Sequence, residues 1–414
     1  MRGAPTVAEP APAAPLRLYN AVADRVAGAD RALPDVDELV ARARREVPGA
    51  DLGGDEWRPA LESFLAALRT EADLTPAGRR FARGVAVSGL ANRLRVERAI
   101  AEHPAILDRP VGPALVVVGL PRSGTTLLQH LLSLDPGNRS LLHWEAARPA
   151  PPPGLDPEAD RARVRAAERA VWLVDRLLLQ ARAVHPTGPR LPTECVTLLA
   201  NGFASLELGV IYQVPSYVRW CLAADMRPHY AFYARQLQVL GWQGQRDRWA
   251  LKCPAHLFWL EELTRALPDA RVVVLHRDPM EVLPSFCRLT TMAARATARA
   301  VDPAATGRLW SGVWAEGVRR ASAARERIPA DRIVDVGYPD LVADPAGTVA
   351  RVYDAFGMAV DGRLLRAVRE HVATHPQPRT GPPPRLEDFG LDPERERRRF
   401  DEAAPGWSPG GGPR

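Results

Sequence analysis

The sequence predicts an α/β fold in which a parallel sheet is flanked by helices. Short, strongly apolar runs such as residues 115–118 and 270–275 recur from residue 115 onward, and central strands buried on both faces have this composition. Each run is followed by a segment in which apolar residues recur every three or four positions. Strands that alternate with helices in this way build parallel sheets, so the chain is expected to form one.

Four regions are expected along the chain, and one of them contains an insertion. Residues 1–16 are rich in Pro and Ala and are expected to form a disordered tail. Residues 17–110 have helical periodicity and are predicted to form a helical N-terminal region. Residues 111–395 are predicted to form the α/β domain, with residues 155–245 as a helical, aromatic-rich insertion that caps the ligand edge of the sheet. Residues 396–414 are expected to be a C-terminal tail.

Local patterns place the individual elements. Four strands are expected, at residues 115–118, 249–252, 270–275 and 332–336. Thr75 before Pro76 predicts a helix start, because a Thr side chain caps a first turn and Pro is tolerated at the first helical position. Longer helices are expected near residues 309–327 and 361–375. The aromatic side chains of the capping insertion are expected to serve mainly burial.

Composition narrows the class of protein. Lys and Arg total 55 against 49 Asp and Glu, for a formal charge of +6 and a pI near 9.5. A single lysine, Lys252, stands among these basic residues, so the pI reflects an arginine-rich background and no nucleic-acid partner is expected. No run of roughly 18 apolar residues and no export signal occur, so no membrane span and a cytoplasmic location are predicted. The four cysteines are scattered and suggest neither disulfides nor a metal site.

A glycine-bounded turn follows the first predicted strand. Residues 119–126 read Gly-Leu-Pro-Arg-Ser-Gly-Thr-Thr, and the spacing of Gly119 and Gly124 is that of a phosphate-binding loop at a helix N-terminus. Thr125 and Thr126 stand where a nucleoside triphosphate loop has Lys followed by Ser or Thr. The loop is therefore expected to hold a phosphate group that belongs to a different ligand.

Basic side chains follow three of the predicted strands. Arg122 lies in the loop after the first strand, Lys252 ends the second, and Arg277 follows the third, with Ser285 eight positions later. Because ligands of open parallel sheets bind at the carboxyl ends of the strands, these residues are expected to converge. Guanidinium groups and an ammonium group in one place favour an anionic ligand.

These motifs resemble those of the sulfotransferases that use 3′-phosphoadenosine-5′-phosphosulfate (PAPS). Residues 119–126 resemble the family's 5′-phosphosulfate loop, and Arg277 with Ser285 resembles its 3′-phosphate site. Residues 251–256 resemble the catalytic-lysine segment, and residues 336–345 the late strand that carries a tyrosine. The loop, with Arg after Pro, is most similar to the bacterial branch related to tyrosylprotein sulfotransferases.

The resemblance implies a P-loop-type core and an in-line transfer of the sulfuryl group from PAPS to a hydroxyl of a small-molecule or lipid acceptor, with PAPS as co-substrate and no metal. It also implies two sets of site residues. The residues implied in binding the co-substrate are Arg122, Ser123, Gly124, Thr125, Thr126, Arg277, Ser285 and Tyr338. Arg122 and Lys252 are implied in stabilising the negative charge that develops on the leaving phosphate.

The base that removes the acceptor proton has more than one candidate. Glu145 lies close to the position of the glutamate in the tyrosylprotein relatives, and His256 follows Lys252 by four residues. Glu194 is a third candidate, although its sequence context is typical of a capping turn. Glu145 is favoured among them. The family's basic C-terminal clasp is represented only by Arg379 and Arg385, whose role the sequence leaves open.

Two other functions remain open at this point. A P-loop kinase is disfavoured by the missing loop lysine and because residues 272–275 lead into His-Arg rather than a magnesium-binding Asp. A non-catalytic nucleotide-binding protein would keep the same motifs. The acceptor and the oligomeric state are not predicted.

Overall fold

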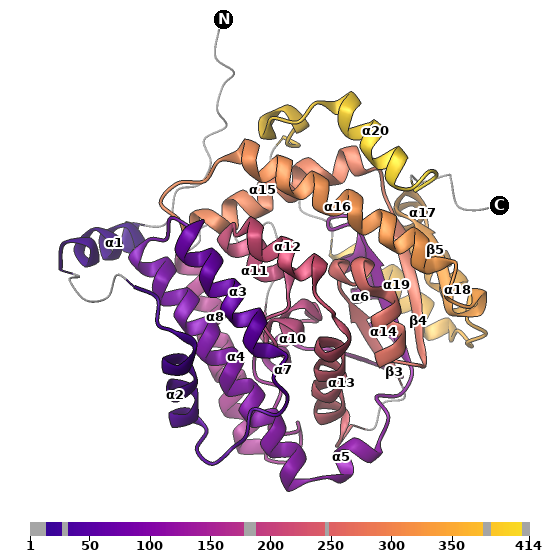
Figure 1. Cartoon of the computed structure of the whole chain (residues 1–414). Coiled ribbons are helices and arrows are strands. Elements are labelled where there is room, and N and C mark those ends of the chain that lie inside the picture. The colour runs from indigo at the N-terminus through magenta and orange to yellow at the C-terminus, as the bar shows by residue number, and fades with distance from the viewer. Residues whose placement is uncertain (1–13, 27–31, 178–187, 245–247, 376–381, 408–414) are drawn as a thin grey trace, which may run out of the picture.

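The structure is a computed structural model of the chain. It describes residues 14–26, 32–177, 188–244, 248–375 and 382–407, and Figure 1 shows them as coloured ribbon.

A parallel sheet of five strands lies at the centre of the α/β part (Figure 1). The strands are β1 (Ala114–Gly119), β2 (Asn138–Ser140), β3 (Arg248–Lys252), β4 (Ala270–His276) and β5 (Ile333–Gly337), in the spatial order β2-β3-β1-β4-β5. The predicted α/β fold is confirmed, and each of the four predicted strands lies within one residue of the observed bounds.

The central strand β1 is covered on both faces. Val116 and Val118 pack into the larger hydrophobic core, which also includes the N-terminal helices. Leu115 and Val117 point to the opposite face and pack into a second core that also contains Tyr353. Because side chains alternate between faces along a strand, an apolar residue at every position fits burial on both sides.

The N-terminal region is helical, as predicted. Its helices are α1 (Ala14–Val26), α2 (Val36–Glu46), α3 (Trp57–Thr70), α4 (Pro76–Glu102) and α5 (Ala105–Asp108). The predicted helix start is confirmed, because the Thr75 hydroxyl accepts a hydrogen bond from the Gly78 N–H at 3.0 Å and Pro76 is the first helical residue. Helix α1 begins at Ala14, inside the stretch predicted to be a tail, because Leu16 is buried in the folded structure.

Helices also form most of the chain that connects β2 to β3. They are α7 (His143–Ala147), α8 (Pro157–Leu177), α10 (Val196–Ala200), α11 (Leu206–Tyr212), α12 (Pro215–Ala223) and α13 (Arg227–Gly241), and α6 (Thr125–Leu132) precedes β2. Most of the aromatic side chains here are buried, as predicted, including Tyr217, Tyr230 and Tyr233, whereas Trp172 is exposed.

The remaining helices surround β4 and β5. They are η1 (Pro254–Trp259), α14 (Leu260–Ala266), α15 (Pro279–Arg295), α16 (Pro303–Arg325), η2 (Ala330–Arg332), α17 (Tyr338–Ala343), α18 (Pro345–Ala355), α19 (Gly362–Thr374), η3 (Leu386–Phe389) and α20 (Pro393–Ala403), where η marks a 3-10 helix. Within the described ranges, no helix has both the length and the apolar character needed to cross a bilayer.

The prediction of a tail from residue 396 was wrong for residues 396–407. Glu396 is buried in α20 and accepts a hydrogen bond from the Ser311 hydroxyl, and Phe400 one turn later is also buried. Trp407 packs on His276, with ring centroids 4.7 Å apart. Charged residues between Glu396 and Phe400 make α20 polar on average, although one narrow side of the helix faces the protein interior. The composition therefore suggested a solvent-exposed end.

Candidate active site at the carboxyl edge of the sheet

The turn between β1 and α6 has a backbone that requires glycine at two positions. Gly119 has φ 152° and an added Cβ would lie 2.6 Å from the carbonyl oxygen of Leu275. Gly124 has φ 98°, and an added Cβ would lie 2.7 Å from Cδ2 of Tyr338. Left-handed backbone and close neighbours together exclude a side chain at both positions. The spacing of the two glycines thus follows from the shape of the turn.

The same turn offers hydrogen-bond donors to an anion. The Ser123 hydroxyl is fully buried and has no hydrogen-bond partner among the described residues. Thr125 and Thr126 begin α6, where the first N–H groups of a helix have no partner inside the helix. An unpaired hydroxyl beside a helix N-terminus is suited to a phosphate or sulfate group.

The predicted arginines meet around this turn. Arg277 donates from Nη1 to the carbonyl oxygen of Arg122 at 3.0 Å, and its guanidinium lies 4.0 Å from the ring centre of Tyr338. Arg122 donates from Nε to the Ser285 hydroxyl at 3.3 Å. The structure therefore brings together residues that follow β1, β4 and β5 and one residue of α15, and the first and last of them are more than 200 positions apart.

Positive charge is concentrated at this place. Burial lowers the pKa of the Arg122 guanidinium, and the charges of Arg288 and Arg277 lower it further. Arg288 lies on α15 one turn beyond Ser285, and the sequence analysis did not single it out. An anion bound here would relieve the repulsion between these guanidinium groups.

Lys252 links the turn to a carboxylate. Its side chain is 2% exposed, and Nζ donates to the Thr126 hydroxyl at 3.2 Å and to Oε1 of Glu194 at 2.5 Å. Glu194 remains partly exposed to solvent. A buried ammonium is stable when it is paired and hydrogen-bonded, and these two partners supply that.

Backbone hydrogen bonds hold Glu194 in this position. The Cys195 N–H donates to the carbonyl oxygen of Lys252 at 3.0 Å, and the Thr193 N–H donates to that of Leu141 at 2.8 Å. The segment before α10 is thus tied to the end of β3 and to the residues after β2. No local signal in the sequence marks this arrangement, because Glu194 and Lys252 are 58 positions apart.

Glu145 has a different environment. One carboxylate oxygen accepts from Arg139 at 2.8 Å, and the other accepts from the Leu142 N–H at 3.1 Å. The side chain is buried, and burial raises the pKa of its carboxyl against the opposing effect of Arg139. Both oxygens of Glu145 are thus engaged at the first turn of α7.

His256 is enclosed in η1. Its Nδ1 lies 2.7 Å from the hydroxyl of Tyr230, and its buried Nε2 has no hydrogen-bond partner among the described residues. Burial lowers the pKa of His256 to about 3, so the imidazole is neutral at physiological pH.

A further acidic residue approaches Glu194 from α11. Burial raises the pKa of Glu207 to about 7, and the charge of Glu194 raises it as well. The sequence analysis did not single out Glu207. Helix α11 packs beside α10, which follows Glu194, and the Ser205 hydroxyl donates to the carbonyl oxygen of Val196 at 2.9 Å.

Arg379 and Arg385 are the two arginines predicted to represent a C-terminal clasp. Arg379 lies outside the described residues. Arg385 is exposed and pairs with Glu387 at 3.1 Å. Arg288 donates from Nη1 to the carbonyl oxygen of Pro382, three residues before Arg385, at 3.4 Å.

The chain is similar to known sulfotransferases over most of its length. A profile of the sulfotransferase family matches residues 113–362. The structure of sulfotransferase STF9 from Mycobacterium avium is 30% identical, covers 91% of this chain and 97% of its own, and gives a TM-score of 0.81. The structure of sulfotransferase STF1 from Mycobacterium tuberculosis is 32% identical, covers 89% of this chain and 99% of its own, and gives a TM-score of 0.76.

Curated relatives match over a shorter stretch. Omega-hydroxy-beta-dihydromenaquinone-9 sulfotransferase Stf3 of Mycobacterium tuberculosis and of Mycobacterium bovis is 27% identical over 131 residues. These residues are 30% of this chain and 32% of the relative, so the match spans about a third of the curated proteins.

The family match bears on the functions that the sequence left open, because it covers more than half of the chain and includes the phosphate loop, Lys252 and Arg277. It supports a sulfotransferase enzyme rather than a kinase. The chain belongs to the sulfotransferase family.

Proposed function

We propose that the protein transfers the sulfuryl group of PAPS to a hydroxyl of a small-molecule or lipid acceptor. One observation carries the proposal: Lys252 Nζ contacts both Thr126 of the phosphate loop and the carboxylate of Glu194. A donor phosphate on one side and an acceptor hydroxyl on the other would then meet at a single ammonium group.

The chain's own residues fit the donor. The unpaired Ser123 hydroxyl and the start of α6 suit its 5′-phosphosulfate, and Thr125 and Thr126 complete that cradle. Arg277 with Ser285 suits a second phosphate, and the Tyr338 ring beside Arg277 offers a flat surface near an adenine. A nucleotide with phosphate groups at two positions matches the two separate groups of donors.

The proposed reaction needs a base and a stabilised leaving group. The acceptor oxygen forms a bond to sulfur while the bond from sulfur to the phosphate oxygen breaks, and the acceptor proton passes to a carboxylate. Lys252 and Arg122 stabilise the charge that develops on the departing 3′,5′-bisphosphate. The reaction consumes no oxidant or reductant.

We assign the base to Glu194. It is partly exposed, and Lys252 holds it in place at the loop. Glu145, the base favoured from the sequence, has both oxygens engaged by Arg139 and the backbone, and His256 is fully enclosed. A general base must reach the hydroxyl that it deprotonates, and this requirement favours Glu194.

The acceptor class rests on two supports. The name of the mycobacterial relative Stf3 describes a sulfotransferase of a hydroxylated menaquinone, which is a lipid. The helical insertion that supplies Glu194 is also rich in aromatic and apolar side chains, many of which pack in the core. We therefore propose a hydroxylated apolar acceptor.

Two variants test the donor site. Lys252→Ala is expected to lower turnover by about 100-fold or more while 3′-phosphoadenosine 5′-phosphate (PAP) still binds, because the ammonium acts on the developing charge. Arg277→Ala is expected to weaken PAP binding measured by calorimetry. Sulfate transfer from labelled PAPS to a panel of phenols and alcohols gives the turnover. Near-normal turnover of Lys252→Ala would contradict the mechanism.

Three further variants identify the base. Glu194→Gln is expected to lower kcat by about 100-fold or more and to remove the acidic limb of the pH–rate profile. Glu145→Gln, which retains size, and His256→Asn, which retains a polar group, serve as comparisons, and both are expected to keep that limb. A profile that loses its acidic limb in Glu145→Gln and keeps it in Glu194→Gln would assign the base to Glu145.

A further inference from the structure

Gln129 connects the helix of the phosphate loop to the segment that carries Glu194. It lies on α6, and its side chain is buried. Its Nε2 donates to the carbonyl oxygen of Thr193 at 3.1 Å, although 64 positions separate the two residues. Thr193 immediately precedes Glu194 in the chain. A buried amide thus links the helix on the donor side of the site to the residue that we assign as the base.

The position of Gln129 on α6 places it behind the phosphate loop. Thr125 and Thr126 begin this helix, and the Thr126 hydroxyl accepts a hydrogen bond from Lys252 at 3.2 Å. Gln129 follows Thr125 by four positions and Thr126 by three. Residues at these spacings lie on the same side of a helix, so one side of α6 carries both the contact with Lys252 and the contact with Thr193.

Residues 191–195, which we call the base segment, are also held by backbone hydrogen bonds. The Thr193 N–H donates to the carbonyl oxygen of Leu141 at 2.8 Å, and the Cys195 N–H donates to that of Lys252 at 3.0 Å. These two bonds fix the segment to the residues after β2 and to the end of β3. The glutamine amide adds a bond to α6, the helix that begins at the phosphate loop.

The surroundings of Gln129 indicate why an amide is needed there. Its neighbours on α6, Leu128, Leu131 and Leu132, are buried and apolar. A side chain that served only packing could be apolar as well. Burying an amide costs free energy unless it is hydrogen-bonded, so the bond to Thr193 offsets that cost. The amide therefore specifies where the base segment lies against α6.

We propose that Gln129 is a positioning residue that holds Glu194 at a fixed distance from the phosphate loop. The kinetic consequence rests on the proposed function, in which Glu194 removes the acceptor proton while the loop holds the donor. The acceptor oxygen must lie near the sulfur at the moment when its proton lies near the base, and a displacement of about 1 Å can cost about 100-fold in rate. One helix that contacts both the donor and the base segment keeps these distances constant.

Hydrogen exchange followed by mass spectrometry tests the contact directly and needs no acceptor. Gln129→Met keeps the length of the side chain and removes the amide. Loss of one neutral hydrogen bond corresponds to a change of about five-fold in an opening equilibrium, so the base segment is expected to exchange about five-fold faster. Gln129→Asn, whose amide is one methylene too short to reach Thr193, is the second variant. It is expected to give the same change if Gln129→Met unfolds at the assay temperature.

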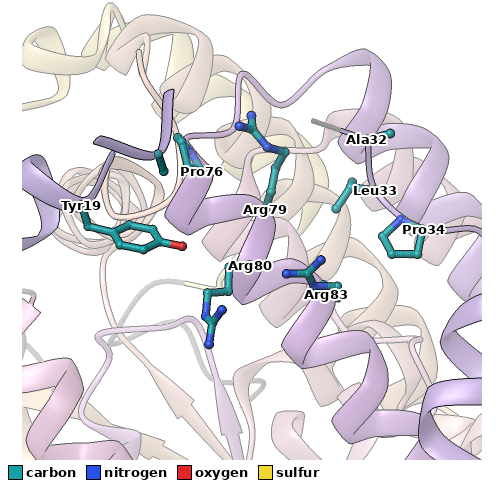
Figure 2. Close-up of a pocket in the computed structure, with 9 residues that line it drawn as sticks. Tyr19, Ala32, Leu33, Pro34, Pro76, Arg79, Arg80 and Arg83 are labelled. Carbon is teal, nitrogen blue, oxygen red and sulfur yellow. The ribbon is translucent and has the colours of Figure 1, made fainter. Parts of the chain in front are cut away.

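Gln238→Met is the matched control. The Gln238 Nε2 donates to the carbonyl oxygen of Arg109 at 2.8 Å, so the control removes the same kind of hydrogen bond between distant segments. It is expected to leave exchange of the base segment and turnover unchanged. The first turns of α4 are the internal reference for exchange, because α4 and α6 lie apart in Figure 1. Figure 2 shows these turns at a pocket that they form with Tyr19 of α1 and Leu33.

Kinetic measurements test the consequence of the contact. Gln129→Met is expected to lower kcat for sulfate transfer from PAPS by about 10-fold or more, with PAP affinity unchanged in calorimetry. The double variant Gln129→Met/Glu194→Gln is expected to turn over no more slowly than Glu194→Gln alone, because residues that act as a unit are not additive. A merely structural role would add its own loss to that of Glu194→Gln.

The outcomes separate this proposal from the assignment of the base. Unchanged exchange of the base segment in Gln129→Met and Gln129→Asn would overturn the positioning role. Equal acceleration of exchange in Gln238→Met, or additive losses of kcat in the double variant, would overturn it as well. Near-normal turnover of Glu194→Gln, together with faster exchange in Gln129→Met, would instead remove Glu194 as the base and leave the positioning of the segment in place.

Discussion

Gly124 allows the sharpest test of the phosphate loop. Its φ of 98° costs a residue with a side chain about 1–2 kcal/mol. An added Cβ would also lie 2.7 Å from the Tyr338 ring, which must then move away from Arg277. The contact between that ring and the guanidinium contributes about 0.5–1 kcal/mol. Gly124→Ala is therefore expected to destabilise the loop by about 1.5–3 kcal/mol in total.

The assay is calorimetric titration with PAP. A loss of about 1.5–3 kcal/mol corresponds to a Kd about 10- to 150-fold higher. Gly84→Ala is the matched control, because Gly84 lies in α4 with no atom within 4 Å of an added Cβ. It is expected to bind PAP normally and to gain up to about 1 kcal/mol of stability. Equal PAP affinity of the two variants would refute the argument that the loop requires glycine.

Two further predictions concern stability. An added Cβ at Gly307 would lie 2.3 Å from the carbonyl oxygen of Phe389, whereas Gly312 in the same helix has open space. Gly307→Ala should therefore lower the free energy of unfolding by about 1–3 kcal/mol, and Gly312→Ala should not. Equal urea midpoints of the two variants would contradict this prediction. Burial lowers the pKa of His229 to about 4 and that of His256 to about 3. In the unfolded chain both imidazoles take up a proton near pH 6.5, whereas in the folded chain they stay neutral until the pH approaches the lower folded pKa. The free energy of unfolding should therefore fall on acidification from pH 6.5 toward the folded pKa, by at most about 1.4 kcal/mol per pH unit for each histidine. Urea unfolding of His229→Gln between pH 7.5 and pH 5 should show a smaller loss than the wild type, and an identical loss would contradict the effect.

The sheet and the phosphate loop could be predicted from the sequence because their signals are local. A strand such as β1 is apolar at nearly every position, and the glycines at 119 and 124 are required by the backbone of one short turn. The convergence of Lys252 and Arg277 on that turn followed from a general rule, since the carboxyl ends of parallel strands lie at one edge. These parts needed no knowledge of the helices between the strands.

The neighbour of Lys252 could not be predicted in the same way. Glu194 comes from a segment whose sequence suggests a capping turn, and backbone hydrogen bonds to Lys252 and Leu141 bring it to the site. Glu145 occurs nearer to the position expected from the resemblance, but Arg139 engages it. Which of several glutamates lies beside the lysine depends on packing between distant segments, and no local pattern encodes it.

The contacts of Trp407 affect when the phosphate-binding site can be complete during synthesis of the chain. His276, immediately before Arg277, contacts the Trp407 carbonyl oxygen at 2.9 Å and Asp335 at 2.8 Å. The contacts that support Arg277 beside the phosphate loop thus include Trp407, which lies almost 300 positions after Gly119 in the chain. During synthesis, domains generally fold as units. This nascent chain can complete the support of Arg277 only when residue 407 has left the ribosome.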